Sequence, residues 1–318
     1  MVDMIMRGLF ITFTIKTILL SSTIAWADAS DASSSIIIEG GLSYSGVSRS
    51  GSALNNPTPT NIRELESFEI ATVDGFIALP IGKSYLFQIE GINEISNADS
   101  ITPSGNPTRF TYDRSSFIGA QFGRNLGDNH YFGVFSGTGN TEFVPTNAAQ
   151  ARAAANYNVF GLSGAYHTAN WSFTGQFGRI DADSQNAETL SNFTFSRFIT
   201  QRFFNQGKTA VNVSIAIGSG DQDFDSPTPD KTALRAFELG VEHSLPINIF
   251  GSTTSAYASF EHITVDEKSA ANGDIDDTIF SIGFNVNFGA KSLRDRERRT
   301  AQRMPKFGRW LASVPAVD

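Results

Sequence analysis

The stretch "DDTIFSIGFNVNFG", residues 276–289, decides the fold. Apolar and polar residues alternate along it, and the apolar set ends at Phe288. An alternation with a period of two is typical of a β-strand with one apolar and one polar face. The chain does not end with this strand, because 30 residues of a different composition follow Phe288.

The same alternation recurs along most of the chain. In "KTAVNVSIAIGSG", residues 208–220, Val211, Val213 and Ile215 alternate with small or polar residues. No helical period competes with this pattern before Gly289. We therefore predict twelve strands, at about residues 35–46, 67–79, 84–95, 109–122, 129–137, 153–167, 170–181, 190–203, 208–218, 232–245, 253–265 and 277–288.

The connections between these strands alternate between long and short. "PIGK" (80–83) and "TAN" (168–170) are tight, whereas "SGDQDFDSPTPDK" (219–231) is long and acidic. Long loops at one end and tight turns at the other are typical of an all-β, transmembrane, antiparallel up-and-down β-barrel. An even number of strands brings both ends of the barrel segment to the short-turn end, which is the periplasmic end in such barrels.

The N-terminal segment predicts export from the cytoplasm. Arg7 and Lys16 accompany a short apolar run, and Ala25-Trp26-Ala27 has the form of a cleavage site. We expect a signal peptide over residues 1–27. The chain contains no cysteine, which suits an oxidising compartment and excludes disulfides and thiolate metal sites.

Charge divides the rest of the chain into two parts. Residues 28–288 carry a net charge of −14, whereas residues 289–318 carry +5. We predict a barrel over 28–288 and a basic periplasmic tail over 289–318. Three contacts remain open for the tail: anionic lipid of the inner leaflet, peptidoglycan, and the acidic lumen of the barrel.

A soluble secreted β-sandwich or lipocalin-like barrel is the alternative fold, because its strands also alternate. Such a protein hides its aromatic faces and shows charge outside. Here the polar faces are mostly Ser, Thr, Asn, Gln and Gly, and charge concentrates in the long loops. This distribution favours a lipid-facing exterior and a wet interior, and a closed barrel is the sheet form that can cross a bilayer.

The chain resembles the porin-like outer-membrane β-barrel proteins of Gram-negative bacteria over about residues 28–288. Their last strand carries a polar-x-Gly-x-x-apolar-x-apolar signal for the barrel-assembly machinery, which Ser281, Gly283, Val286 and Phe288 match. In most of those proteins the phenylalanine is the final residue, whereas here it is internal. The resemblance implies an outer-membrane location, with lipid, lipopolysaccharide and the assembly machinery as partners.

We predict a porin-like channel for passive diffusion of small hydrophilic solutes or ions, with a preference for cations because the body is acidic. The alternatives are a non-conducting structural or surface-interaction barrel and an outer-membrane hydrolase. Carboxylates four residues apart on a strand lie ~13 Å from each other, too far for a catalytic pair. The candidate lumen-lining residues are Glu90, Glu94, Glu238, Glu242, Glu261, Asn285 and Asn287.

No pattern in the sequence predicts an enzyme. The four histidines, His130, His167, His243 and His262, are scattered, and neither a HExxH nor a G-x-S-x-G motif is present. We expect no catalytic residue, no metal site, no cofactor and no nucleic-acid partner. The oligomeric state stays open.

Arg197 breaks the alternation in "SNFTFSRFIT", residues 191–200. Strict alternation places Phe193, Phe195 and Ile199 on the lipid side, and it carries Arg197 there as well. An arginine at the midplane costs ~2–4 kcal/mol. We therefore expect a bulge near Ser196 that turns Arg197 inward.

Overall fold

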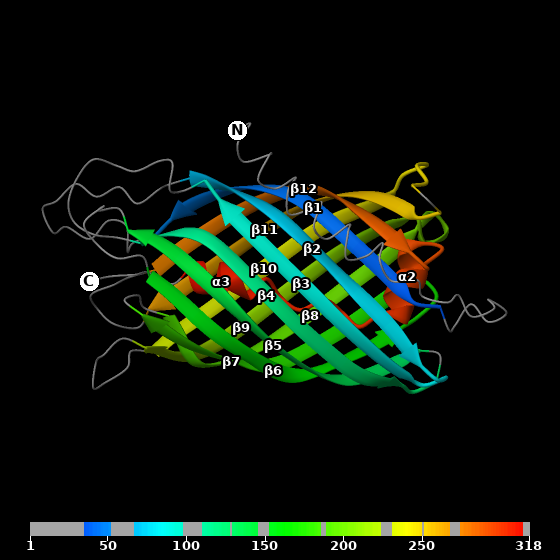
Figure 1. Cartoon of the computed structure of the whole chain (residues 1–318), viewed down its shortest axis with the longest axis horizontal. Helices are drawn as coiled ribbons and strands as arrows, with labels where there is room; N and C mark the ends of the chain where they lie inside the picture. Colours follow the sequence, from blue (N-terminus) through cyan, green and yellow to red (C-terminus); the bar gives the residue numbers. More distant parts are fainter. Residues whose placement is uncertain are drawn as a thin grey trace, which may run out of the picture.

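The computed structural model is a barrel of twelve antiparallel strands in which β1 closes the sheet against β12 (Figure 1). It describes residues 35–51, 67–97, 110–127, 129–145, 153–185, 189–223, 231–249, 251–267 and 274–313. The predicted signal peptide lies outside these residues. The strands are β1 (Ile37–Ser50), β2 (Ser67–Ile81), β3 (Tyr85–Ser96), β4 (Phe110–Asn125), β5 (His130–Pro145), β6 (Ala153–His167), β7 (Trp171–Gln185), β8 (Thr189–Phe204), β9 (Thr209–Asp223), β10 (Lys231–Ser244), β11 (Thr253–Glu267) and β12 (Asp274–Phe288).

The predicted fold class, strand number and meander order are confirmed. Several strands are longer than predicted, and most of the extra residues lie at the long-loop end. The strand expected at 129–137 runs over His130–Pro145, and the one expected at 208–218 runs over Thr209–Asp223. Glycine-rich and polar segments such as 136–142 weaken the apolar alternation, yet they keep the backbone pairing of the ladder.

The opening stretch is the closing strand of the barrel. Phe288 pairs with Ile38, the first residue of β1 in this ladder. Phe280, Ile282 and Phe284 point outward and are more than half exposed, whereas the residues between them point inward. The strand therefore closes the hydrogen-bonding ring and contributes to the apolar outer surface.

An apolar belt covers the outside of the barrel. Large apolar side chains are exposed on most strands, among them Leu42, Ile118, Phe160, Phe177 and Ile217. Closure leaves no unpaired strand edge, which is what a sheet needs in order to lie in hydrocarbon. The barrel thus has the architecture of an outer-membrane β-barrel.

The tail does not lie outside the barrel. After Phe288 the chain turns into the lumen and forms α2 (Leu293–Arg299) near the short-turn end and α3 (Phe307–Ala312) deeper inside, with an extended segment between them (Figure 1). Of the three contacts left open for the tail, the structure shows the acidic lumen for residues 290–313. No helix among the described residues is long and apolar enough to span a membrane.

Gly289 makes the turn from the wall into the lumen. Its φ is +92°, a left-handed conformation that favours glycine. A Cβ at this position would collide with the carbonyl oxygen of Ile36. Ser292 then caps α2, because its Oγ accepts a hydrogen bond from the Asp295 backbone N–H at 3.1 Å.

The tail crosses most of the lumen. Near the short turns, Arg299 donates to the carbonyl oxygen of Ser35, 2.7 Å away. Near the long loops, Arg49 at the end of β1 donates to the carbonyl oxygen of Ala312, 2.9 Å away. The described chain thus starts and ends at opposite ends of the barrel. Two periplasmic termini stay a prediction, because the termini lie outside the described residues.

The lumen itself is divided into a polar and an apolar half. The half near the short turns is lined by carboxylates, amides and hydroxyls. The half near the long loops is lined by apolar side chains that pack around α3. These include Val47, Phe68, Ile70, Tyr112, Phe143, Val159, Ile180, Leu190, Phe193, Leu234, Ile263, Val265 and Ile279.

Strand β8 corrects one facing prediction. Phe193, Phe195 and Ile199 are buried inside the barrel rather than exposed to lipid, and Arg197 lies inward with them. The register of β8 against β9 shifts between Ser191 and Thr194, not near Ser196. Both phenylalanines belong to the apolar half of the lumen and pack in the same cluster as α3, so an apolar residue on this strand can face inward.

Candidate functional site: the luminal plug and the gap beside it

Three tail arginines bind carboxylates of the barrel wall. The ion pairs are Arg296 with Glu39 (2.7 Å) and Glu242 (2.8 Å), Arg303 with Asp74 (3.0 Å) and Glu39, and Arg309 with Glu94 (2.8 Å) and Glu261 (3.3 Å). Each arginine thus bridges two wall carboxylates from different strands. A planar guanidinium with five N–H donors suits this role better than an ammonium.

These ion pairs are buried, so they constrain the tail strongly. The side chains of Glu39 and Glu94 are each 1% exposed. A buried pair adds little net stability, but the loss of one partner leaves a charge without compensation, which costs ~3–5 kcal/mol. The wall carboxylates and the tail arginines therefore need each other to neutralise their buried charges.

Aromatic packing holds α3 in the apolar half. Phe307 and Trp310 lie edge to face with ring centroids 5.5 Å apart. Phe195 of β8 packs against both rings, and Phe117 of β4 packs against Phe307. Such edge-to-face pairs contribute beyond their buried area.

The extended segment between α2 and α3 is fixed through its backbone. Gln88 forms two hydrogen bonds with Ala301: the Ala301 N–H donates to Oε1 (3.0 Å), and Nε2 donates to the carbonyl oxygen (3.1 Å). The Met304 N–H donates to Glu90 Oε1 at 2.9 Å. Beyond α3, Ser313 Oγ donates to Asp277 at 2.7 Å. These hydrogen bonds to β3 and β12 hold the tail in addition to the ion pairs of its arginines.

The seven candidate lumen residues all lie on the inner face, but most of them hold the tail or its partners. Glu90, Glu94, Glu242 and Glu261 accept hydrogen bonds from tail residues. Asn285 donates to Glu242, and Asn287 donates to Glu39. Glu238 forms its ion pair with a wall residue instead of the tail, since Arg197 of β8 donates to it at 3.2 Å.

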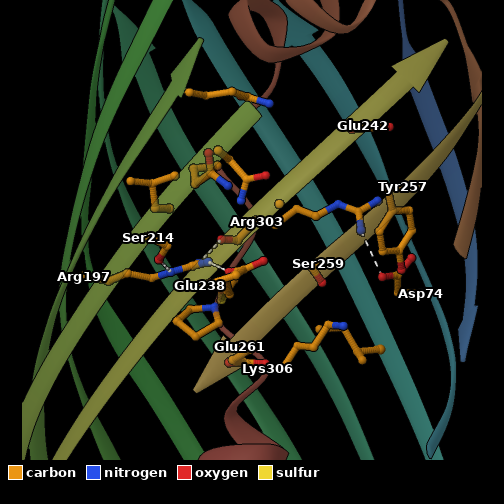
Figure 2. A pocket seen from close by; sticks show the side chains of 18 of the residues that line it. Asp74, Arg197, Ser214, Glu238, Glu242, Tyr257, Ser259, Glu261, Arg303 and Lys306 are labelled. Carbon is orange, nitrogen blue, oxygen red and sulfur yellow. Dashed lines mark hydrogen bonds and ion pairs between the residues drawn. The ribbon is translucent and has the colours of Figure 1, made fainter. Parts of the chain in front are cut away.

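A gap remains between the tail and the wall formed by β8–β11 (Figure 2). Its volume is about 210 Å³. Short inward side chains create it: Ser214 and Ala216 on β9, Ala236 and Gly240 on β10, and Ser259 on β11. Along β10 it extends from Ala236 to Glu242, about 20 Å of strand at the usual rise.

Charged groups surround the middle of this gap. Arg197 donates to Ser214 Oγ at 2.9 Å and to Glu238 Oε2 at 3.2 Å (Figure 2). Glu238 and Glu261 stand directly opposite each other on β10 and β11. Lys306 of the tail lines the same gap, and its Nζ has no hydrogen-bond or ion-pair partner among the described residues.

The histidines do not form a catalytic arrangement among the described residues. His167 Nδ1 lies 3.0 Å from Ser172 Oγ, which also lies 3.4 Å from Glu297 Oε1. The serine thus stands between the histidine and the carboxylate, whereas a catalytic triad places the histidine in the middle. No group of three or more metal-ligating side chains occurs in the described part of the chain.

Sequence reasoning missed the residues that matter most in this site. Arg296, Arg303 and Arg309 were assigned only to a basic tail, and Glu39 and Asp74 were not singled out. A signal was available in the opposite charges of body and tail. Trp310 and Phe307 are further signals, because large aromatic side chains are usually buried and so indicate that the tail packs against another part of the protein.

Comparisons with known proteins give the fold alone. No family model matches this chain, and no curated protein matches it. Solved structures that it resembles include the COG4313 outer membrane channel from Pseudomonas putida F1 (10% identity, TM-score 0.47, 83% of this chain and 100% of that one). Others are the translocator domain of the autotransporter NalP from Neisseria meningitidis (10%, 0.47, 90% and 98%) and the outer membrane protease OmpT from Escherichia coli (10%, 0.31, 84% and 100%).

Proposed function

We propose that this protein is a porin-like outer-membrane channel for small hydrophilic solutes or ions whose opening is controlled by its own C-terminal tail. One observation carries the proposal: the tail fills the lumen but forms no part of the barrel sheet. All twelve strands pair with one another, and the described tail joins the barrel covalently only through Gly289. The barrel can therefore stay closed as a sheet whether or not its lumen is filled.

The tail-filled state is a closed state. The apolar half of the lumen packs around α3, with Leu190, Ile263 and Leu311 fully buried there. The charged groups at this depth, Arg309 with Glu94 and Glu261, are already paired with one another. An ion that crosses the apolar layer would therefore lose its hydration and find few free polar partners, at high cost. The polar gap beside β8–β11 ends at this layer near Trp310 and Ala236.

Displacement of α3 would join the gap to the long-loop end and open a polar route. This movement would uncover Glu94 and Glu261, whose charges Arg309 of α3 now balances. Displacement of the whole tail would also uncover Glu39, Asp74 and Glu242, which Arg296 and Arg303 now bind. The preference for cations predicted from the acidic body therefore belongs to the open state in this proposal.

Planar-bilayer recording of the full chain and of a chain lacking residues 290–318 tests the proposal. We expect the full chain to be mostly silent, with rare openings, and the truncated barrel to conduct steadily. Assembly of the truncated barrel is checked first by its strand content in circular dichroism. A truncated barrel that inserts into the bilayer and never conducts would rule the channel out.

The apolar layer also favours a second function, a non-conducting structural or surface-interaction barrel. In that case α3 is a permanent core, and the long acidic loops are the working surface. Recordings that stay silent for both chains, with correct insertion, would support this alternative. An outer-membrane hydrolase has no support from the described histidines.

The remaining partners follow from the same proposal. The apolar belt would contact outer-membrane lipid and lipopolysaccharide. Ser281 and Gly283 face inward on β12, whereas Val286 and Phe288 face outward, where the barrel-assembly machinery would read them as a signal. Peptidoglycan remains a partner for the outermost cations of α2, such as Arg294, because the deeper arginines are bound in the lumen.

A further inference from the structure

We propose that the gap beside the tail is a binding site for small zwitterionic solutes that carry one ammonium and one carboxylate group, the class of the free α-amino acids. The site lies between the tail and β8–β11 (Figure 2). A role for this site in solute passage rests on the proposed channel function, whereas binding of the solute can occur without conduction.

Two opposed carboxylates form the ammonium-binding side. Glu238 and Glu261 are register partners on neighbouring strands, where like charges destabilise a sheet unless cations compensate them. Arg197 and Arg309 each bind one of them, and each does so through the Oε2 atom. Both Oε1 atoms remain without a hydrogen-bond partner among the described residues, and both side chains keep some exposure, 30% and 15%.

An ammonium group fits these two oxygens. It carries three N–H donors in a compact head and can therefore donate to both carboxylates at once. A guanidinium is too broad to enter between side chains that Arg197 and Arg309 already contact. This geometry selects a primary or secondary amine over an arginine-like ligand.

Lys306 forms the carboxylate-binding side. It comes from the tail and lines the gap together with Glu238 and Glu261 (Figure 2). Its ammonium is the charged head in this group that no described residue binds. The carboxylate of a solute would supply the missing partner.

The local charge count discriminates among ligand classes. Arg197, Arg309 and Lys306 balance Glu238, Glu261 and Glu94, the second carboxylate that Arg309 binds. A simple amine or a simple carboxylate would add an uncompensated charge to this neutral group. A molecule that carries both groups adds no net charge and can meet both Lys306 and the two Oε1 atoms, so it fits best.

The size of the gap sets an upper limit on the ligand. A volume of about 210 Å³ holds a small amino acid together with a few water molecules. Ala216, Ala236 and Trp310 line the end of the gap near the apolar layer. A short hydrocarbon side chain would lie against them.

Isothermal titration calorimetry on the detergent-solubilised full chain tests this assignment with three matched probes: L-alanine, ethylamine, which lacks the carboxylate, and propionate, which lacks the ammonium. We expect alanine to bind at least about tenfold more tightly than either analogue, because each lost charge-assisted contact is worth about that factor. Lys306→Met should lower the affinity for alanine to that for ethylamine, and the affinity for ethylamine itself should not change. Glu238→Gln should lower the affinity for alanine to that for propionate.

The controls separate the site from the fold. Lys83→Met changes an exposed lysine in the β2–β3 turn and should alter nothing. If Glu238→Gln loses strand content, Glu261→Gln tests the same side of the site. Failure of alanine to bind saturably, or an unchanged ratio of alanine to ethylamine affinity in Lys306→Met, would overturn the inference.

This outcome is independent of the recordings. Conduction by the truncated barrel without alanine binding to the full chain would leave the channel standing and remove the site. Alanine binding to the full chain, with recordings that stay silent for both chains, would support the site and rule out the channel.

Discussion

Arg309 is the residue on which the closed state depends most directly. Its side chain is 3% exposed and bridges Glu94 and Glu261, and it also donates to Ser45 and Thr72 of β1 and β2. Arg309→Met keeps much of the volume and removes the charge. The carboxylate of Glu94, which is 1% exposed, would then lose the cation with which it forms its ion pair.

We predict that Arg309→Met destabilises the inserted tail by ~3–5 kcal/mol. Urea titration of the solubilised protein, followed by the fluorescence of the neighbouring Trp310, measures the shift in midpoint. Arg294→Met is the matched control, since Arg294 lies in the same tail and binds the Ala169 carbonyl oxygen rather than a wall carboxylate. Addition of Glu94→Gln to Arg309→Met should restore part of the loss, and a double variant that is no more stable than the single one would contradict the charge argument.

The turn at Gly289 is the second residue-scale constraint. Gly289→Ala should destabilise tail insertion by ~1–3 kcal/mol, because alanine is strained at a φ of +92° and its Cβ meets the Ile36 carbonyl. The same urea titration measures this change. Gly46→Ala, on the outer face of β1 with open space around its Cα, should be close to neutral. Equal midpoints for the two alanine variants would show that the turn does not limit insertion.

At the scale of elements, α3 is the part of the tail that must move for a route to open. Gly308 lies against Ser115 of β4: a Cβ built on Gly308 is 2.6 Å from the Ser115 Cβ. A small backbone adjustment would bring two cysteines at these positions to the ~3.8 Å that a disulfide spans. The chain contains no other cysteine, so the pair would have no competing partner.

We predict that Gly308→Cys/Ser115→Cys, oxidised in the full chain, abolishes the rare openings in planar-bilayer recordings, and that a thiol reductant restores them. The cause is direct, because the disulfide ties α3 to the wall in its closed position. Each single cysteine variant, treated with the same reagents, is the control. Openings that persist at full frequency in the oxidised protein would show that the route does not pass α3.

The strands were predictable from the sequence because alternate residues of each strand face the apolar bilayer and the polar lumen. "SIGFNVNF" shows that alternation in full, so the strand and the side to which each of its residues points follow from the pattern. Strand β8 shows the limit. Phe193 and Phe195 face inward because α3 fills that half of the lumen. A local sequence pattern cannot predict which residues a distant segment of the chain will cover.

The same limit applies to the candidate site. Glu90, Glu94, Glu242 and Glu261 lie on the inner face where the period of two places them. Their partners could not be predicted, because Arg296, Arg303 and Arg309 lie on a segment with no strand register to fix their positions. Charge opposition indicates an association between tail and lumen, but only the tertiary structure pairs each arginine with its carboxylates.

At the scale of the whole molecule, tail and body are complementary charges on one chain. The body carries −14 and the tail +5, and three of the tail cations neutralise wall carboxylates inside the lumen. Removal of the tail therefore changes both the width of the lumen and its field. Width alone would alter conductance equally for cations and anions, whereas the field distinguishes them.

We predict that the barrel lacking residues 290–318 prefers cations, so that its reversal potential in a KCl gradient moves toward the potassium potential. The effect should weaken at high ionic strength, because salt screens the wall carboxylates. A truncated barrel that also carries Glu39→Gln, Glu94→Gln and Glu242→Gln keeps the same width to within a few atoms and is the matched control. Its selectivity should fall toward neutrality while its conductance stays similar. Anion preference in the truncated barrel would contradict the role of these carboxylates, and equal selectivity in the two truncated barrels would show that the field arises from the acidic loops instead.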